Sequence, residues 1–349
     1  MPELIVTNFN RNYTGVSATA AAVLRQQVEQ FDVALAGHPL PGAPDPITQK
    51  EALRLSRTAP EGKPFTIWHV RRNPEMRVAI WARDVLRLPI RIVFTSAAIR
   101  RHSAYPRWLI SRMDAVIATT QEAAAFVPHV KAVIPHGVET ERFAPAPDRN
   151  AAWAATGYPG AKGIATIGRI RPEKGTDRFV KAMLDVLPKH PDTPALVIGR
   201  AAKEHQGFLN DLKKKVTNAH LENRILFPGE IAPGDLPDLL RTLSLVVQLP
   251  RYEGYGMTPL EGMASGVPFV ATDQGYYRAF SGQSQAGIVT SDAAQDIDAL
   301  LSDHERLSKM ARHARESALH HFSIGREAAE IASVYQKLWS TASSPSSAG

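Results

Sequence analysis

Hydrophobic positions along the chain alternate between short continuous apolar runs and longer segments with helical spacing. Short runs rich in Val, Ile and Leu are typical of buried parallel strands. The pattern predicts strands at Leu4–Thr7, Val33–Ala36, Phe65–His69, Ile90–Thr95, Ala115–Thr119 and Ala132–Pro135 in the first half. In the second half it predicts strands at Gly163–Ile167, Ala195–Gly199, Arg224–Phe227, Leu243–Leu249, Val267–Ala271 and Gly287–Val289.

Between these runs, apolar residues recur three and four positions apart, which is typical of amphipathic helices. The expected helices are Ala18–Gln30, Pro74–Leu86, Pro106–Met113, Gln121–Phe126, Gly175–Leu187, His205–Val216, Asp235–Leu243, Pro259–Ser265, Ala294–Ser302, Asp303–His321 and Ile324–Trp339. Strands that alternate with helices favour an α/β fold with parallel sheets.

The alternation occurs twice, and a loop rich in Pro, Ala and Gly at about 144–162 separates the two halves. We therefore expect a Rossmann-like N-terminal domain at 1–150 and a Rossmann-like C-terminal domain at 151–323. A helix at 324–339 and a disordered Ser/Ala/Pro-rich tail at 340–349 follow. Ligands are expected at the carboxyl ends of the strands, where the strand order reverses.

The amino-acid composition excludes several classes of site and function. The 349 residues include no cysteine, which excludes disulfides, thiolate metal sites and cysteine nucleophiles. The N-terminus does not resemble a signal peptide, and no apolar run is long enough to span a bilayer, so we expect a cytoplasmic protein.

Positive charge is concentrated in one segment. Residues 71–112 hold ten arginines, no lysine and two acids. Arginine suits bidentate contacts with phosphate and carboxylate groups. This segment is either a solvated basic face or a surface for an anionic acceptor and an anionic membrane leaflet. Nucleic acid is not expected, because no nucleic-acid motif accompanies the charge.

Two loops carry the candidate chemistry. The sequence Glu253-Gly-Tyr-Gly-Met-Thr-Pro-Leu-Glu261 joins a predicted strand to a predicted helix and places two carboxylates around a small Gly-rich loop. Backbone N–H groups at such a helix start favour a diphosphate, and the carboxylates suit hydroxyls of a ribose or a sugar. The sequence Gly168-Arg-Ile-Arg-Pro-Glu-Lys-Gly175 sets Arg169 and Lys174 at another strand-to-helix turn, where two cations can hold a diphosphate.

Together these motifs resemble the signature of retaining glycosyltransferases of family 4 with the GT-B fold. The sequence Ile134-Pro-His-Gly-Val-Glu139 also fits that family. The stretches Trp68 to Met76, Val93-Phe-Thr-Ser-Ala-Ala98 and Arg112-Met-Asp-Ala-Val-Ile-Ala-Thr119 resemble the lipopolysaccharide core mannosyltransferases of alphaproteobacteria. The resemblance implies two domains facing a cleft, with the last helix crossing back to the N-terminal domain.

The resemblance also implies roles. Arg169 and Lys174 would hold the donor diphosphate, Glu261 the ribose hydroxyls, and Glu253 the transferred sugar. The remaining donor-binding candidates are Gly15, Gly199, Arg200, Pro228, Glu230, Ile231, Gly254, Tyr255, Gly256, Met257 and Thr258. Catalysis would involve Glu253, Lys174, Arg169 and a histidine.

Which histidine serves is open, because this chain has Phe94-Thr95-Ser96 where relatives place a sugar-binding histidine. His69 and His102 are the nearest candidates, and His69 is the catalytic prediction. The acceptor side would use Arg71, Arg72, Arg100, Arg101 and His102.

The expected reaction moves a hexose, preferentially mannose from GDP-mannose, to the inner core of lipopolysaccharide. It would need no metal and no other cofactor, and the enzyme would sit peripherally on the cytoplasmic face of the inner membrane. Three alternatives stay open: the same fold with UDP-glucose or ADP-heptose, a sugar-nucleotide epimerase, and a non-catalytic anion-binding protein.

Overall fold

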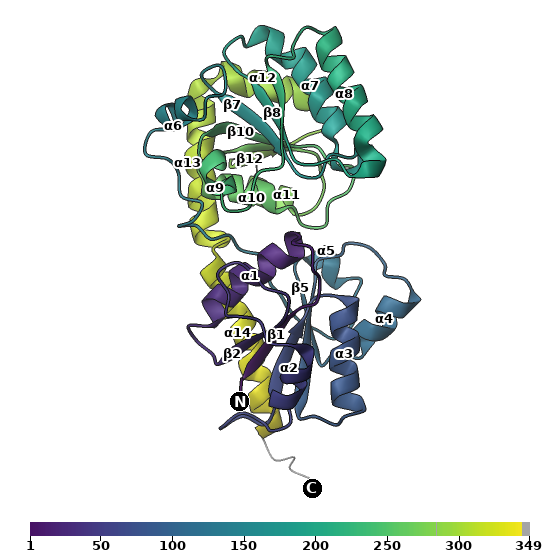
Figure 1. Ribbon diagram of the computed structural model, residues 1–349. Helices are drawn as coiled ribbons and strands as arrows, with labels where there is room; N and C mark the ends of the chain where they lie inside the picture. Colours follow the sequence, from purple (N-terminus) through teal and green to yellow (C-terminus); the bar gives the residue numbers. More distant parts are fainter. Residues whose placement is uncertain (284, 344–349) are drawn as a thin grey trace. The chain divides into compact units, whose positions relative to one another are not determined.

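The computed structural model describes residues 1–283 and 285–343 and divides the chain into two compact units (Figure 1). Unit 1 comprises Met1–Gly137 together with Ile324–Gly349, and unit 2 comprises Val138–Ser323. Each unit contains one six-stranded parallel sheet with helices on both faces. The predicted α/β class with two Rossmann-like units is therefore confirmed.

Unit 1 orders its strands β2-β1-β3-β4-β5-β6, all parallel. The strands are β1 (Leu4–Asn8), β2 (Val33–Gly37), β3 (Thr66–Val70), β4 (Ile90–Ser96), β5 (Ala115–Ala118) and β6 (Val130–Val133). The helices are α1 (Gly15–Gln27), α2 (Gln49–Leu55), α3 (Asn73–Asp84), α4 (Ala104–Ser111), α5 (Gln121–Ala124) and α14 (Ile324–Ser343).

Alternation along the strands of unit 1 builds two apolar layers, because successive side chains point to opposite faces of a sheet. On β3, Trp68 joins a cluster with α2, α3 and α4, whereas its neighbour Ile67 joins a cluster with α1 and α14. The same division holds for Ile92 and Val93 on β4. Both faces of this sheet are thus buried, which explains its continuous apolar runs.

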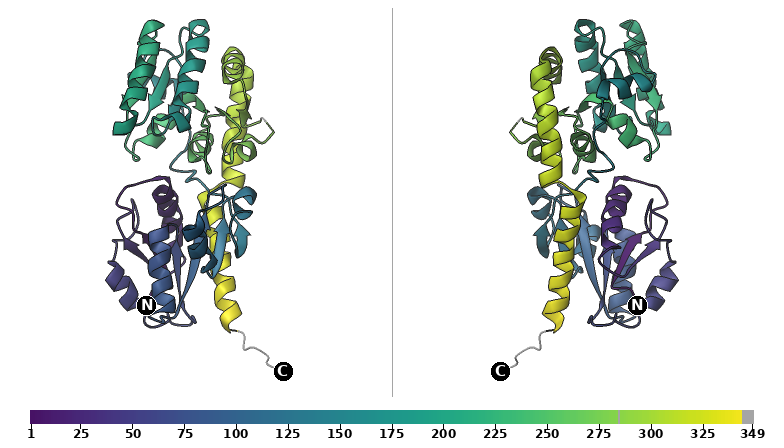
Figure 2. Two further views of the ribbon diagram at one scale, coloured as in Figure 1. Left: turned by 90° about the vertical axis from the view of Figure 1, so that its right-hand side faces the viewer. Right: turned by 90° about the vertical axis from the view of Figure 1, so that its left-hand side faces the viewer.

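The C-terminal helix α14 belongs to unit 1, where it lies beside α1 along the sheet (Figure 2). Gln27 of α1 donates from its Nε2 to the hydroxyl of Tyr335 at 3.0 Å, and the indole N–H of Trp339 donates to the carbonyl of Phe65 at 3.0 Å. Tyr335 is fully buried. The helix α14 thus contributes to the core of unit 1.

Unit 2 orders its strands β12-β11-β10-β7-β8-β9, again all parallel. The strands are β7 (Gly163–Ile167), β8 (Ala195–Ile198), β9 (Ile225–Gly229), β10 (Leu243–Gln248), β11 (Phe269–Ala271) and β12 (Gly287–Val289). The α-helices are α6 (Arg149–Ala155), α7 (Thr176–Val186), α8 (Gln206–Asn218), α9 (Leu236–Leu240), α10 (Met257–Ala264), α11 (Tyr277–Ser281), α12 (Ala293–Ser302) and α13 (His304–His321), and short 3-10 turns cover η1 (Pro172–Lys174), η2 (Leu187–Lys189) and η3 (Lys203–His205).

Alternation again divides the core of unit 2. On β10, Leu245 and Val247 face a cluster with α7, α8 and α12, whereas Val246 faces a cluster with α10 and α13. The largest side chains of the first cluster include Phe179, which is fully buried. Among the described residues of both units, no helix combines the length and apolar character needed to cross a bilayer.

The division between the units differs from the predicted boundary at residue 150. Residues 138–150 belong to unit 2, and the predicted linker at 144–162 contains α6, whose Trp153 is buried in the core of unit 2. A single buried tryptophan in a Pro- and Ala-rich stretch gave too little periodicity to predict that helix. The last helix ends at Ser343 instead of residue 339, and residues 344–349 of the predicted tail lie outside the described residues.

Candidate functional site

Unit 2 reverses its strand order between β7 and β10. The chain continues from β7 to β8 and β9 on one side, then returns to place β10 on the other side of β7. The carboxyl ends of these two strands are joined directly, because Gln248 donates from its Nε2 to the carbonyl of Ile167 at 3.0 Å. Open α/β sheets bind ligands at such a switch point, since the loops after the two strands diverge there.

The loops after β7 and β10 contact each other through Gly175. This residue has a φ of 70°, and a Cβ added to it would lie 1.7 Å from the carbonyl oxygen of Leu249. Only glycine fits such a close approach of two backbones. The close approach brings Lys174 and Glu253 together, with 2.5 Å between Nζ and Oε2. Their side chains remain 25% and 20% exposed, so a ligand can reach both.

Arg169 adds a second cation at the same place. It is exposed, and it lines a small hollow at the ends of β7 and β8 together with Lys174 and Thr176, the first residue of α7. The N-terminus of a helix carries partial positive charge. The structure thus gathers two cationic side chains and the start of a helix around one hollow, which is the arrangement that holds a diphosphate.

The helix α10 begins directly beyond Glu253. Its cap Gly256 has a φ of 92°, and an added Cβ would lie 2.2 Å from the ring of Tyr277. Tyr255 is buried and stacks on Tyr276 at 5.2 Å, which fixes the loop. The backbone N–H of Gly254 donates to Oε1 of Glu253 at 3.1 Å. Met257 and Thr258 follow half-buried in the first turn, next to the candidate carboxylate.

Glu261 lies one helical turn into α10 and is half-buried. The pKa of this carboxyl is raised to about 7, mainly by burial. The charge of Arg142 opposes the rise in pKa, and the charge of Glu139 adds to it. Removal from water disfavours the charged form of a carboxyl group. Near neutral pH this group can therefore accept or donate a hydrogen bond, and both suit a hydroxyl-bearing ligand.

The candidates for the base pocket occupy the next two strand ends. Gly199 follows β8 and donates its backbone N–H to the carbonyl of Gly229 at 2.8 Å. Arg200 and Glu230 are both exposed, with 3.6 Å between Nε and Oε2. Pro228 lies within β9, two residues before Glu230, and Ile231 follows Glu230 directly. The predicted donor residues of unit 2 thus lie at the carboxyl ends of β7, β8, β9 and β10, on the loops that follow them, and in the start of α10.

In unit 1, the strand order also reverses, between β1 and β3, and Arg72 occupies that point. Its guanidinium donates to the side chains of Asn8, Glu75, Thr14 and Ser17 at 2.8–3.2 Å. These bonds fix the loop before α1. Gly15 is the first residue of α1, and a Cβ added to it would have no other atom within 4 Å. Its two terminal nitrogens thus bind within the protein, and the acceptor-binding role of Arg72 stays a prediction.

His69 does not reach an accessible surface. It is fully buried, its Nδ1 lies 2.5 Å from the hydroxyl of Tyr335, and its Nε2 lies 2.7 Å from Oγ1 of Thr95. Burial, followed by the nearby charge of Arg71, keeps its pKa well below the usual value. With both ring nitrogens engaged, His69 ties β3 and β4 to α14, and its catalytic role stays a prediction.

Three buried polar atoms without a hydrogen-bond partner lie at the carboxyl ends of the neighbouring strands β3, β4 and β5. They are Nη1 of Arg71, Oγ of Ser96 and Oγ1 of Thr119. Burial lowers the pKa of Arg71, although Tyr335 and Glu75 oppose the shift. Unpaired buried polar groups are costly, so such a cluster marks a place where a polar ligand can bind. Sequence reasoning included Arg71 and missed Ser96 and Thr119, whose only signal was their position at strand ends.

The loop after β4 holds the other acceptor candidates. Arg100 and Arg101 are exposed, whereas His102 is half-buried with an Nε2 that has no partner. Burial and then Arg100 lower the pKa of His102. Within the described part of the chain, no group of three or more His, Asp or Glu side chains is placed to hold a metal ion.

Comparison with known proteins identifies the family. Residues 154–317 match the family model described as glycosyl transferases group 1. The chain is 40% identical over 347 residues to the lipopolysaccharide core biosynthesis mannosyltransferase LpsB of Rhizobium meliloti (strain 1021), covering 96% of this chain and 97% of that protein. It is also 40% identical over 346 residues to the mannosyltransferase LpcC of Rhizobium leguminosarum bv. viciae, covering 96% of each.

Solved structures agree on the fold. The crystal structure of Anabaena Alr3699/HepE in complex with UDP and glucose superimposes with a TM-score of 0.80, at 17% identity, and covers 96% of this chain and 100% of that one. Identity at this level establishes a shared fold alone. The two full-length relatives carry the family assignment, and they confirm the one predicted from the sequence. The chain belongs to the group 1 glycosyltransferases.

Proposed function

We propose that this glycosyltransferase moves a mannosyl residue from GDP-mannose to a sugar of the inner lipopolysaccharide core, with retention of the anomeric configuration. The observation that carries the proposal is 40% identity, over nearly the full length, to two proteins named lipopolysaccharide core biosynthesis mannosyltransferases. The pairing of Lys174 with Glu253 at the switch point of unit 2 adds a chemical reason.

In this proposal, unit 2 binds the donor. The diphosphate lies against Arg169 and Lys174, at the start of α7. Glu261 bonds the ribose hydroxyls, and Glu253 faces the sugar with the first turn of α10. Lys174 then exchanges part of its contact with Glu253 for a phosphate oxygen, since a diphosphate carries more negative charge than one carboxylate.

The reaction breaks the bond between the anomeric carbon and the diphosphate oxygen. A bond forms from the acceptor hydroxyl oxygen to the same face of that carbon, and the hydroxyl proton passes to the leaving diphosphate. Arg169 and Lys174 stabilise the charge that develops on the leaving group, which is the main electrostatic contribution in such a site. Glu253 stabilises positive charge at the anomeric carbon. No protein nucleophile is required.

The same two cations lead us to propose that transfer needs no divalent metal. Their positive charge takes the place of an ion at the diphosphate. Full activity after dialysis against excess EDTA is the expected result. Loss of activity that added Mg²⁺ or Mn²⁺ restores would refute this part of the proposal.

On unit 1, we propose that Arg71, Ser96 and Thr119 contact the acceptor. Arg71 suits a phosphate or a sugar carboxylate, and the two hydroxyls suit sugar hydroxyls. Arg100, Arg101 and His102 extend this surface on the loop after β4. An acceptor of this kind is lipid-linked, so we place the enzyme peripherally on the cytoplasmic face of the inner membrane.

The donor is tested by thermal shift and product analysis with GDP-mannose, UDP-glucose and ADP-heptose. A ligand at 100 times its Kd stabilises the native state by about 2.7 kcal/mol. We expect that shift with GDP-mannose and an α-linked mannoside by NMR. Stabilisation and transfer with UDP-glucose or ADP-heptose instead would refute the mannosyl assignment, and conversion of a sugar nucleotide without acceptor would indicate an epimerase.

A further inference from the structure

Unit 1 exposes several large apolar side chains on two helices outside the candidate site. On α3 and just after it, Trp81 is 45% exposed and Val85 is 64% exposed; on α4, Tyr105 is 51% and Trp108 is 54% exposed. Tyr105 and Trp108 stack with ring centroids 6.3 Å apart. We name these four side chains the tryptophan face. Contiguous exposed apolar groups on a soluble protein mark an interaction surface.

The four side chains share one surface because the two helices are linked at their ends. Arg112 follows α4 and donates to Asp84 at the end of α3, with 2.6 Å between the atoms. Trp108 lies four residues before Arg112, and Trp81 lies three residues before Asp84. Residues three and four apart are neighbours on a helix surface. Both tryptophans therefore lie one helical turn from the same ion pair.

Positive charge surrounds the tryptophan face. Arg77, Arg87 and Arg107 are exposed, and no acidic partner is found for them among the described residues. The nearby carboxylates are already neutralised: the hydrogen bond from Arg83, together with Arg112, lowers the pKa of Asp84 to about 2. The charge left over on this face is positive, and it favours an anionic partner.

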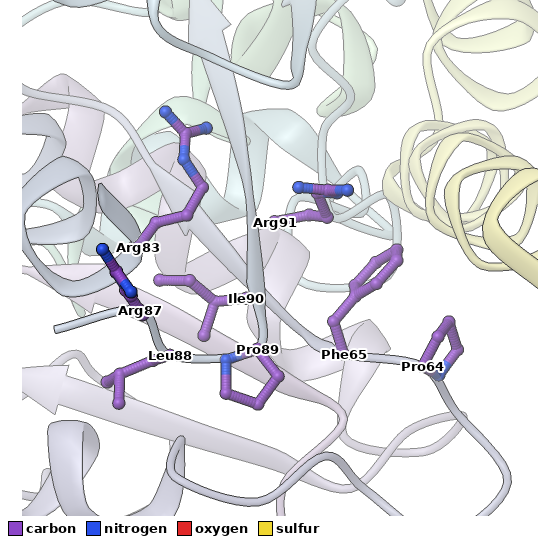
Figure 3. A pocket seen from close by; sticks show the side chains of 8 residues that line it. All are labelled: Pro64, Phe65, Arg83, Arg87, Leu88, Pro89, Ile90 and Arg91. Carbon is purple, nitrogen blue, oxygen red and sulfur yellow. The ribbon is translucent and has the colours of Figure 1, made fainter. Parts of the chain in front are cut away.

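A hollow of about 310 Å³ lies on the same unit where α3 ends and β4 begins (Figure 3). Its lining includes three arginines, Arg83, Arg87 and Arg91, and the apolar side chains of Phe65 and Ile90. Arg91 also lies over the ring of Phe65 at 5.4 Å. Arg83 and Arg91 also pair with Asp114, at 2.6 Å and 3.5 Å, whereas no carboxylate partner is found for exposed Arg87 among the described residues. A free guanidinium beside apolar side chains suits a phosphate headgroup attached to an acyl chain.

We propose that the tryptophan face docks the enzyme on an anionic lipid bilayer. The aromatic side chains enter the boundary between headgroups and acyl chains, where amphipathic rings are favoured. The arginines of α3 and α4 contact lipid phosphates, whose negative charge attracts basic segments. This inference deepens the proposed function, because it rests on a lipid-linked acceptor and names the surface that brings the enzyme to it.

Tryptophan fluorescence can test whether this face enters a bilayer. The chain has five, of which Trp68, Trp153 and Trp339 are buried, and only Trp81 and Trp108 are exposed. The full-length protein is mixed with vesicles of phosphatidylglycerol and phosphatidylcholine whose acyl chains carry bromine at a known depth. We expect a blue shift and quenching of fluorescence with phosphatidylglycerol present, and neither with phosphatidylcholine alone.

Variants separate this surface from any other. Trp81→Phe with Trp108→Phe keeps binding by sedimentation within about threefold and abolishes the quenching. Trp81→Ser with Trp108→Ser, and separately Arg107→Glu, weaken sedimentation with the same vesicles at least tenfold. Leu319→Ser and Lys214→Glu alter exposed residues of unit 2 and leave binding unchanged.

Three results would overturn the inference: no binding to phosphatidylglycerol vesicles, binding without quenching, or undiminished binding of the serine double variant. Binding instead to an acidic protein, with no affinity for vesicles, would assign the face to a protein partner and also overturn it. Transfer to a water-soluble acceptor fragment is measured in parallel. Its turnover stays unchanged in all these variants, so failure of the docking idea is distinguishable from failure of the proposed reaction.

Discussion

Glu261→Gln tests the environment of the carboxyl group on which ribose binding is proposed to depend. Burial raises the pKa of Glu261 to about 7 from an ordinary value of 4.5. A group whose pKa is raised by folding binds its proton more tightly in the native state. Stability therefore falls as pH rises from about 4.5 to about 7, and the cost persists above that range. Glutamine keeps the shape of the side chain and removes the titration.

The magnitude follows from the shift. Each pKa unit corresponds to about 1.4 kcal/mol, so a rise in pKa from 4.5 to about 7 gives up to about 3.5 kcal/mol. Solvent screening of a half-buried group reduces this free energy, and we expect about 1–3 kcal/mol. Relative to the wild type, the glutamine variant should gain this stability between pH 4.5 and pH 8. A domain of this size gains about 2–4 °C in Tm for each kcal/mol.

The assay is calorimetric Tm of both proteins at half-unit steps from pH 4.5 to pH 8.5. The difference in Tm should widen steadily to pH 7 and then stay constant. Glu316→Gln, which removes an exposed carboxyl from α13, controls for the loss of one charge. A Tm difference that does not change with pH would show that Glu261 is not buried as described. The same variant should bind GDP-mannose about tenfold more weakly, because a carboxylate bonds a hydroxyl more strongly than an amide does.

Lys174→Met should lower kcat by about 10²–10³-fold, because the charge that stabilises the leaving group is lost. Its free energy of unfolding should change by less than about 1 kcal/mol, because the lysine is partly exposed. Normal turnover of this variant would refute the role of Lys174. Lys189→Met, which breaks an ion pair of 2.7 Å elsewhere in unit 2, is the matched control and should keep full kcat. Phe179→Ala should destabilise unit 2 by about 3–5 kcal/mol in denaturant unfolding, since the ring is fully buried, and a loss below about 1 kcal/mol would contradict that packing. Glu327→Ala should destabilise unit 1 by about 3–5 kcal/mol, because it leaves buried His136 without the carboxylate 2.7 Å from its Nδ1; an unchanged calorimetric Tm would argue against the pair.

Much of the donor site could be predicted from the sequence because its residues lie on loops directly after strands. Arg169 follows β7 and Glu253 follows β10, so local strand-to-helix patterns located both. The acceptor side was harder. Arg72 and His69 look like free polar groups in the sequence, yet hydrogen bonds to the loop before α1 and to α14 use them internally. Such partners lie far away along the chain, and no local sequence pattern predicts them.

The sequence by itself determined the two parallel sheets, the order of their elements and the family. Apolar alternation and helical spacing are local properties, and each strand buried on both faces must show them. Only the tertiary structure decided which side chains meet: Lys174 reaches Glu253 because β10 inserts beside β7 and Gly175 permits the close approach of their loops. Packing likewise set the pKa of Glu261 and the burial of His69. Contacts and desolvation depend on the three-dimensional order of the strands, which the spacing of residues along one strand does not contain.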